Sequence, residues 1–128
     1  MISIIDISQF RVKLKATIHA SGRLGFTKDT ADFLNLSSFP FVLFASDDED
    51  PELLYMALLS QEMPNSMRVQ LSGKYFYIQT NLLFDNLGFD YKKKTIMFDL
   101  IREPKYDEML SGKTYRMSVR YGKNKKQK

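Results

Sequence analysis

The first clear pattern in the chain is a strict alternation of apolar and polar residues over positions 11–19. The apolar positions are Val12, Leu14, Ala16 and Ile18, and basic residues, a threonine and a histidine stand around them. A period of two is typical of a half-buried β-strand, so this stretch predicts a strand with a basic outer face. Ser21-Gly22 is a turn signal, and the following Leu24-Gly25-Phe26 predicts a second short strand.

After the second strand the apolar spacing becomes helical. Apolar residues recur at Ala31, Phe33, Leu34 and Leu36, with Thr27 or Lys28 before the first turn, which carries Asp29. This pattern predicts a short amphipathic helix over 29–36.

The rest of the first half predicts a hairpin. An apolar run at 39–44 indicates a buried strand with Pro40 at its start, and the acidic stretch 47–51 indicates a charged turn. Residues 53–59 fit either a strand or a helix, and their place in a hairpin favours the strand. Pro64-Asn65-Ser66 then predicts a connector between two halves.

The second half predicts the same order of elements as the first. We expect a strand at 67–71, a turn at Ser72-Gly73, a strand at 75–78, a helix at 80–87 that ends at Gly88, and strands at 94–101 and 113–121, with a helical turn within 105–110. At an offset of 51 residues, Ser21-Gly22-Arg23 matches Ser72-Gly73-Lys74, Phe26 matches Tyr77, Phe33 matches Phe84, and Asn35-Leu36 matches Asn86-Leu87.

These patterns predict a mainly β fold, β or α+β, with short helices. It consists of two tandem strand-turn-strand-helix-strand-turn-strand repeats, at about 11–60 and 67–121, which form one compact domain over 1–121. Each repeat is too small to be very stable as a separate folded unit. Residues 122–128 are expected to be a basic disordered tail.

Charge changes this picture because it is unevenly placed. The 128-residue chain has a formal net charge of +4. Four lysines of the tail supply all of it: Lys123, Lys125, Lys126 and Lys128. Residues 1–66 hold more acidic than basic residues, and residues 67–122 hold more basic than acidic ones. A neutral body with a short basic tail argues against binding of polyanions by bulk charge.

The sequence contains few residues or motifs that are typical of catalytic or metal sites. The chain has no cysteine and one histidine, His19, which argues against disulfides and transition-metal sites. It contains no nucleophile-elbow motif and no phosphate-binding glycine loop. Residues 47–50 lack the ligand spacing and the glycine of a calcium loop, so they are interpreted as a charged hairpin tip. We therefore expect a protein that is not an enzyme and that needs no cofactor or metal.

No apolar run is long enough for a membrane span, and the N-terminus lacks the features of a signal peptide. A cytoplasmic location without membrane partners is the expectation.

The segment Ala20-Ser21-Gly22-Arg23-Leu24-Gly25-Phe26-Thr27-Lys28, followed by the helix at 29–36, resembles the SpoVT/AbrB-like swapped-hairpin family. Two such units in tandem resemble its MraZ-like branch. Thr27 stands where the family usually has proline, Gly25 is unusual in its strand, and Gln79 replaces the lysine at the second helix start. The resemblance implies DNA binding by basic hairpin residues in a dimer or a higher ring. By position, the candidates are Lys13, Lys15 and Arg23, with Lys74 in the second unit.

A weaker resemblance is to the whirly and PUR-like proteins that bind single-stranded nucleic acid. Tyr75 and Tyr77 share one face of their predicted strand beside Lys74, where their rings are candidates for base stacking. Lys92, Lys93 and Lys94 form the densest basic cluster of the body and are further candidates for nucleic-acid binding.

The sequence thus favours a non-enzymatic DNA-binding protein that self-associates, with transcription regulation as a candidate role. Two alternatives stay open: a self-assembly module in which the acidic first half of one chain docks on the basic second half of another, and a single-stranded nucleic-acid binder.

Overall fold

The computed structural model describes residues 1–5, 13–50 and 52–121, and it confirms a mainly β fold with short helices. The first half contains β1 (Lys15–Ile18), β2 (Arg23–Phe26), α2 (Lys28–Leu34), β3 (Phe41–Ser46) and β4 (Leu54–Leu59). The second half contains β5 (Met67–Arg68), β6 (Gln70–Ser72), β7 (Tyr75–Gln79), α3 (Asn81–Asn86), β8 (Ile96–Arg102), η1 (Pro104–Tyr106), α4 (Asp107–Leu110) and β9 (Lys113–Tyr121).

Most elements lie where the patterns predict them, with some differences in their bounds. The 53–59 stretch, which fits a strand or a helix by pattern, forms strand β4, and all six of its residues are buried. Strand β1 begins only at Lys15, and residues 11 and 12 of the predicted strand lie outside the described residues. The predicted strand at 67–71 is divided into β5 and β6 at Val69. The predicted basic tail, 122–128, also lies outside the described residues.

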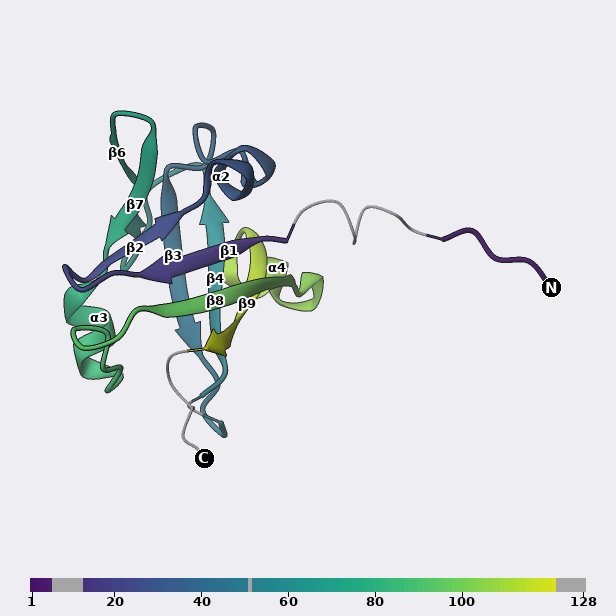
Figure 1. The fold of residues 1–128 in the computed structure, drawn as a ribbon. Coiled ribbons are helices and arrows are strands. Elements are labelled where there is room, and N and C mark those ends of the chain that lie inside the picture. Colours follow the sequence, from purple (N-terminus) through teal and green to yellow (C-terminus); the bar gives the residue numbers. More distant parts are fainter. Residues whose placement is uncertain (6–12, 51, 122–128) are drawn as a thin grey trace.

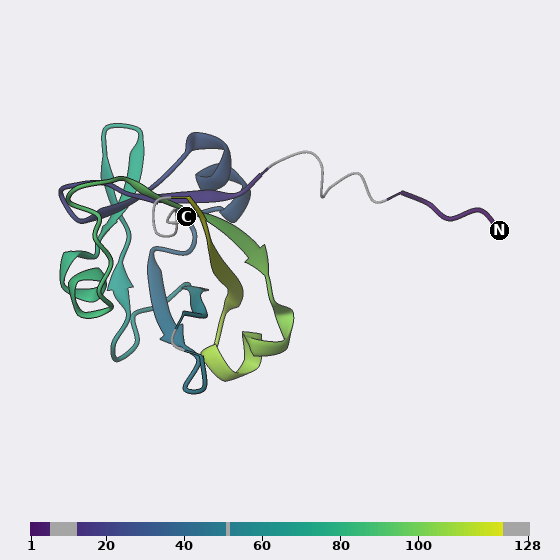
Figure 2. The same ribbon diagram turned by 60° about the horizontal axis from the view of Figure 1, so that its bottom comes forward.

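The nine described strands form one antiparallel sheet in the order β5-β3-β4-β9-β8-β1-β2-β7-β6. Its two edge strands, β5 and β6, are separated along the chain by Val69 alone, whose N–H donates to the carbonyl oxygen of Pro40 at 2.7 Å. Segment 67–72 therefore pairs with β3 through β5 and with β7 through β6. The sheet curls into a nearly closed cylinder, as the ribbon views of Figures 1 and 2 show.

Hairpins from the two halves alternate around this cylinder. The hairpin β3–β4 is followed by β9–β8 of the second half, then by β1–β2 of the first half, and then by β7–β6 of the second half. Each half thus completes its backbone hydrogen bonding on strands of the other half, and the two halves enclose one shared interior.

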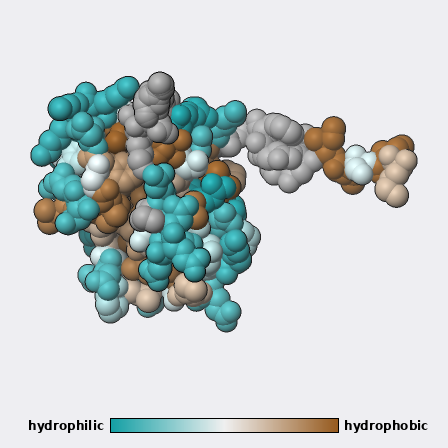
Figure 3. Space-filling view, turned by 90° about the horizontal axis from the view of Figure 1, so that it is seen from below, coloured by the Kyte–Doolittle hydropathy of each residue, from teal (hydrophilic) through white to brown (hydrophobic). Residues whose placement is uncertain are grey.

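In the view of Figure 3, hydrophilic residues in teal and apolar residues in brown and tan both occupy the surface of the body, and the apolar N-terminal segment is seen at one side of it. The side chains of Met1, Ile2 and Ile4 are almost fully exposed.

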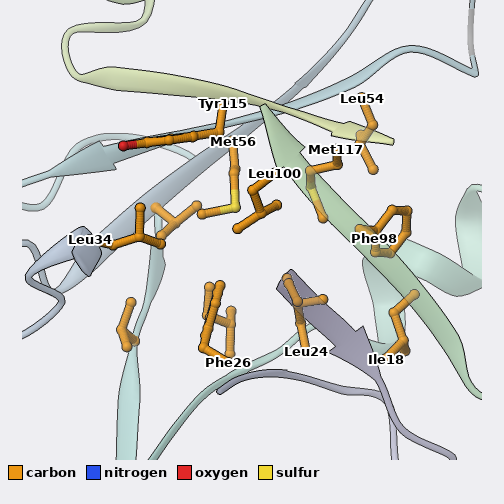
Figure 4. Close-up of a cluster of buried hydrophobic side chains, with 14 of the residues drawn as sticks. Ile18, Leu24, Phe26, Leu34, Leu54, Met56, Phe98, Leu100, Tyr115 and Met117 are labelled. Carbon is orange, nitrogen blue, oxygen red and sulfur yellow. The ribbon is translucent and has the colours of Figure 1, made fainter. Parts of the chain in front are cut away.

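Alternate residues of the strands fill the interior, as Figure 4 shows for residues of β1, β2, β4, β8 and β9. At one end, α3 adds Phe84, which is fully buried. Its ring lies 5.9 Å from that of Phe98 in a stacked arrangement and 5.3 Å from that of Phe89 in an edge-to-face one. Aromatic pairs in these geometries stabilise a core beyond the area that they bury. Helix α3 therefore closes this end of the cylinder.

Helix α2 begins as predicted but presents a different face. The hydroxyl of its N-cap, Thr27, accepts the N–H of Thr30, and Ala31 and Leu34 are buried. Phe33, which the spacing places with the apolar residues, is 57% exposed. The prediction fails because a helix turns about 100° per residue, so a position next to Leu34 and two from Ala31 does not share their face. Its counterpart at the offset of 51 residues, Phe84, is fully buried.

The acidic stretch forms the loop of the β3–β4 hairpin, as predicted. One carboxylate oxygen of Asp47 accepts the backbone N–H groups of Glu49 and Asp50 at 2.8 and 3.2 Å, and a carboxylate oxygen of Asp50 accepts that of Glu52. These bonds are the local side-chain turns that aspartate favours in loops.

Candidate nucleic-acid interface

The turn between β1 and β2 is held in place by the start of α3. Gly22 has a φ of 87°, a conformation that glycine adopts without strain. Its carbonyl oxygen accepts both the backbone N–H and the hydroxyl of Thr80, at 3.0 and 2.8 Å. Thr80 is fully buried. The hairpin of the first half is therefore fixed against the second half.

Four strands present neighbouring side chains on the outer face of the sheet at this hairpin. Thr17 lies opposite Gly25, Gly25 opposite Tyr77, and Tyr77 opposite Gln70. Residues directly opposite one another share a face. We call the following group the aromatic–basic face: His19, Arg23, Gln70, Tyr75 and Tyr77.

Gly25 leaves the space that the ring of Tyr75 occupies. A Cβ atom built on Gly25 would lie 1.5 Å from the hydroxyl oxygen of Tyr75 and 2.4 Å from its Cζ. The phenol therefore lies across the backbone of β2. There it stacks on the ring of Tyr77, with centroids 6.2 Å apart and planes 19° apart, and it lies 6.2 Å from the ring of His19. A glycine that is unusual for the resembled family thus has a structural role in this chain.

Arg23 adds a positive charge to the two tyrosine rings. Its guanidinium carbon lies 4.3 Å from the centroid of Tyr77, a cation–π contact. The Tyr77 hydroxyl donates to Oε1 of Gln70 at 3.3 Å. None of the salt bridges within the described part of the chain involves Arg23, so its charge is available to an anion.

The ring of Tyr75 is partly covered, and its side chain stays neutral at physiological pH. Burial raises the pKa of its hydroxyl above the usual 10.0, and the nearby charge of Arg23 offsets this in part. At 37% exposure the residue still presents surface to solvent. A neutral phenol offers both an aromatic surface and a hydrogen-bond donor.

Lys13 and Lys15 lie at the start of β1, away from the β1–β2 turn. Lys15 is half-buried and lies opposite Asp99 of β8, which forms a salt bridge with Arg120 at 3.0 Å. Lys13 is exposed and lies in the wall of a pocket described below. These two lysines are therefore not part of the aromatic–basic face.

Lys92, Lys93 and Lys94 are exposed and lie close to the opposite end of β1. Ile96 pairs with Ile18, so the antiparallel direction brings the residues before Ile96 toward His19 and the β1–β2 turn. Tyr91, which precedes the cluster, is buried, and a hydrogen bond of 2.6 Å to Asp85 raises the pKa of its hydroxyl. Tyr91 thus anchors the lysine cluster to α3.

Lys74 lies at the far end of β7 from Arg23, because Arg23 pairs with Gln79 while Lys74 precedes Tyr75 in the β6–β7 turn. The structure does not gather the predicted cations at one point. It places Lys74 at one end of the aromatic–basic face, Arg23 at the other, and the 92–94 cluster beyond Arg23. The two tyrosines lie between these charges.

Four of the five residues in this face lie outside the set of predicted cations, although Tyr75 and Tyr77 carry a signal of their own in the Tyr-Phe-Tyr alternation. His19 and Gln70 join the face only because β1, β2, β7 and β6 are neighbours. The described residues contain no group of three or more His, Cys, Asp and Glu side chains arranged to hold a metal ion. None of the helices in the described ranges is both long and apolar enough to cross a membrane.

Comparison with protein-family models, with curated proteins and with solved structures found no match to this chain.

Proposed function

We propose that the protein binds single-stranded nucleic acid on the aromatic–basic face. The observation that carries this proposal is the pair of stacked rings of Tyr75 and Tyr77 with the guanidinium of Arg23 over the second ring. Single strands are bound without strict sequence preference when aromatic side chains stack on bases and nearby cations follow the backbone. Lys74 at one end and the 92–94 cluster near the other end would contact phosphates on either side of the stacked bases.

The arrangement favours a single strand over a duplex. The bases of a duplex are stacked on one another and expose only their edges in the grooves, so a ring that lies flat on the sheet has no base to stack on. The cations of the face are also few, and affinity for a duplex rises with the number of phosphates that are neutralised.

DNA binding with a role in transcription regulation, self-association, and the resemblance to the SpoVT/AbrB-like family stay predictions. Docking of the acidic half on the basic half of a second chain also stays a prediction.

Fluorescence anisotropy with labelled oligonucleotides tests the proposal. A single-stranded DNA, an RNA of the same sequence and the matching DNA duplex are titrated with the full chain. We expect binding of at least one single strand to be stronger than binding of the duplex. Tyr75→Ala should weaken it about 5- to 160-fold, because loss of one stacked base costs about 1–3 kcal/mol. Gly25→Ala should also weaken it, since the new methyl group displaces the ring of Tyr75.

Arg23→Gln has a matched control in Arg68→Gln. Arg68 of β5 also lies over an aromatic ring, with its guanidinium carbon 5.6 Å from the centroid of Phe41, but it is outside the aromatic–basic face. Arg23→Gln should weaken binding, and Arg68→Gln should leave it unchanged. Three outcomes would contradict the proposal: equal effects of the two arginine variants, an unchanged affinity in Tyr75→Ala, or stronger binding of the duplex than of any single strand.

A further inference from the structure

A pocket of about 650 Å³ lies beside residues 13 and 14, next to α2 and the strands β8 and β9. Leu14 accepts a hydrogen bond from the N–H of Leu100, and no described residue of β1 pairs with Ile101 or Arg102 of β8. The walls come from these residues, from α2, and from β8 and β9. Its volume lies within the range of small-molecule sites in proteins.

The apolar wall of the pocket includes the exposed ring of Phe33, and Leu14 and Ile101 add to it. Phe33 is 57% exposed and Ile101 is 39% exposed. Large apolar side chains left open beside a concave surface are typical of a site that covers them with a ligand. A ligand in the pocket would therefore cover Phe33, which the turn of α2 places away from the core.

The pocket wall carries four cations and one carboxylate: Lys13, Arg102, Lys113, Arg120 and Asp99. Two of the cations are neutralised. Arg120 pairs with Asp99 at 3.0 Å, and Arg102 holds both carboxylate oxygens of Asp107 at 2.6 Å. Lys13 and Lys113 form no salt bridge with any carboxylate in the described ranges. The pocket therefore has a net positive charge carried by these two lysines.

Tyr115 also lines the pocket, and it is a polar side chain that is 4% exposed. Figure 4 shows its hydroxyl oxygen on the side of the core where Leu34 of α2 lies. No hydrogen-bond partner for this hydroxyl is found among the residues that the structure describes. A buried hydroxyl without a partner is unfavourable, and a ligand oxygen in the pocket would supply the missing acceptor.

We propose that this pocket binds a small organic anion with an apolar or aromatic part. The carboxylate or phosphate of the ligand contacts Lys13 and Lys113 and accepts the hydroxyl of Tyr115. The apolar part lies against Phe33, Leu14 and Ile101. The pocket is separate from the aromatic–basic face, so this site does not depend on nucleic-acid binding.

Amide NMR titrations of the full chain test the site with phenyl phosphate and phenylacetate as probes. Inorganic phosphate and benzyl alcohol each carry half of the required chemistry and serve as reference compounds. We expect at least one probe to shift the amides of 13–14, 99–102 and 113–115 and to bind at least about tenfold more tightly than both references. Lys113→Gln should weaken this binding, whereas Lys105→Gln, on η1 and outside the pocket wall, should not.

Tyr115→Phe separates ligand binding from folding. Removing a hydroxyl without a partner should leave the free energy of unfolding of the free protein equal or higher, while binding of the probe becomes weaker. The proposal is overturned if the probes bind no better than benzyl alcohol or inorganic phosphate, if the shifts lie elsewhere, or if Tyr115→Phe and Lys113→Gln bind the probe as tightly as the unchanged protein.

Discussion

Gly22 and Gly73 occupy the same place in the two halves, but their surroundings differ. Both follow a serine in a strand-connecting turn, and both have a positive φ, of 87° and 64°. A Cβ atom at Gly22 would lie 2.4 Å from Cβ of Asn81, whereas nothing lies within 4 Å of a Cβ atom at Gly73. The first turn packs against α3, and the second is open to solvent.

Substitution of these two glycines should therefore have unequal costs. Gly73→Ala should lower the free energy of unfolding by about 1–2 kcal/mol, the cost of a left-handed conformation. Gly22→Ala carries the same cost and adds a collision with α3, which raises the loss by about 1–3 kcal/mol. Urea unfolding of the two variants measures the difference. Equal losses would contradict the packing of the Gly22 turn against α3.

Asp107 ties the segment after β8 to β9. Its carboxylate accepts both guanidinium nitrogens of Arg102 at 2.6 Å and the backbone N–H of Thr114 at 2.9 Å. The hydrogen bond from Arg102 is the main cause that lowers the pKa of Asp107 below 3.8. These groups are partly exposed, and solvent screening limits their contribution to stability to about 1 kcal/mol.

The lowered pKa fixes the direction of a pH effect. The contribution of Asp107 is fully present above the pKa of the unfolded chain, near 3.8, and is lost as the pH falls through the still lower pKa of the folded protein. Asp107→Asn should therefore reduce the free energy of unfolding at pH 7, and the difference from the unchanged protein should shrink by pH 2. A difference that grows in acid would contradict this assignment. Unfolding in urea at both pH values measures it.

At the scale of elements, segment 67–72 completes the sheet because it pairs on two sides. Its β5 part binds β3, its β6 part binds β7, and buried Val69 bonds to Pro40 between them. Strand β1 has a similar position, since it pairs with both β2 and β8. Segment 67–72 and β1 thus each pair with strands on two sides, and both help to hold the four hairpins in one cylinder.

Hydrogen exchange tests this closure. The Val69 amide should exchange as slowly as amides in the centre of β2, because its opening requires separation of the two halves. The Gly73 amide, in the exposed turn a few residues later, provides the fast reference. Exchange of Val69 at the rate of Gly73 would mean that the cylinder is open at this edge.

Local sequence patterns predicted well which strands and helices the chain forms, but they did not predict which of these elements are in contact. The alternation at 11–19, the turn glycines and the apolar run at 53–59 each depend on neighbours in sequence. The wrong prediction for Phe33 has a local cause, because its position next to Leu34 already places it on another face of the helix. The division of 67–71 at Val69 shows where local information ends, because each part of the segment pairs with a different strand.

At the scale of the whole molecule, alternation of the hairpins mixes charges that are separated along the sequence. The acidic β3–β4 hairpin lies next to the basic β9–β8 hairpin, and β1–β2 lies between two hairpins of the second half. An acidic half and a basic half in sequence therefore do not become two opposite poles of the fold.

This distribution predicts a shallow salt dependence of nucleic-acid binding. If about three cations of the aromatic–basic face and its ends contact phosphates, the logarithm of the association constant should fall with the logarithm of salt concentration with a slope of about −2 for a single strand. Anisotropy titrations of the full chain at several salt concentrations measure it. A slope of about −5 or steeper would instead assign the binding to more numerous cations, including the four lysines of the tail.

Local sequence patterns were enough to predict the strands, turns and helices, the mainly β class and the positions of the charged residues, because periodicity, turn glycines and residue charge act over a few residues. Which of these residues meet depends on the tertiary arrangement of the strands. The contact of Tyr75 with Gly25, the guanidinium of Arg23 over Tyr77, and the pocket between Lys13 and Lys113 each join strands from different halves of the chain. Such contacts follow from the order of strands in the closed sheet, which is set by burial of one shared core rather than by any local pattern.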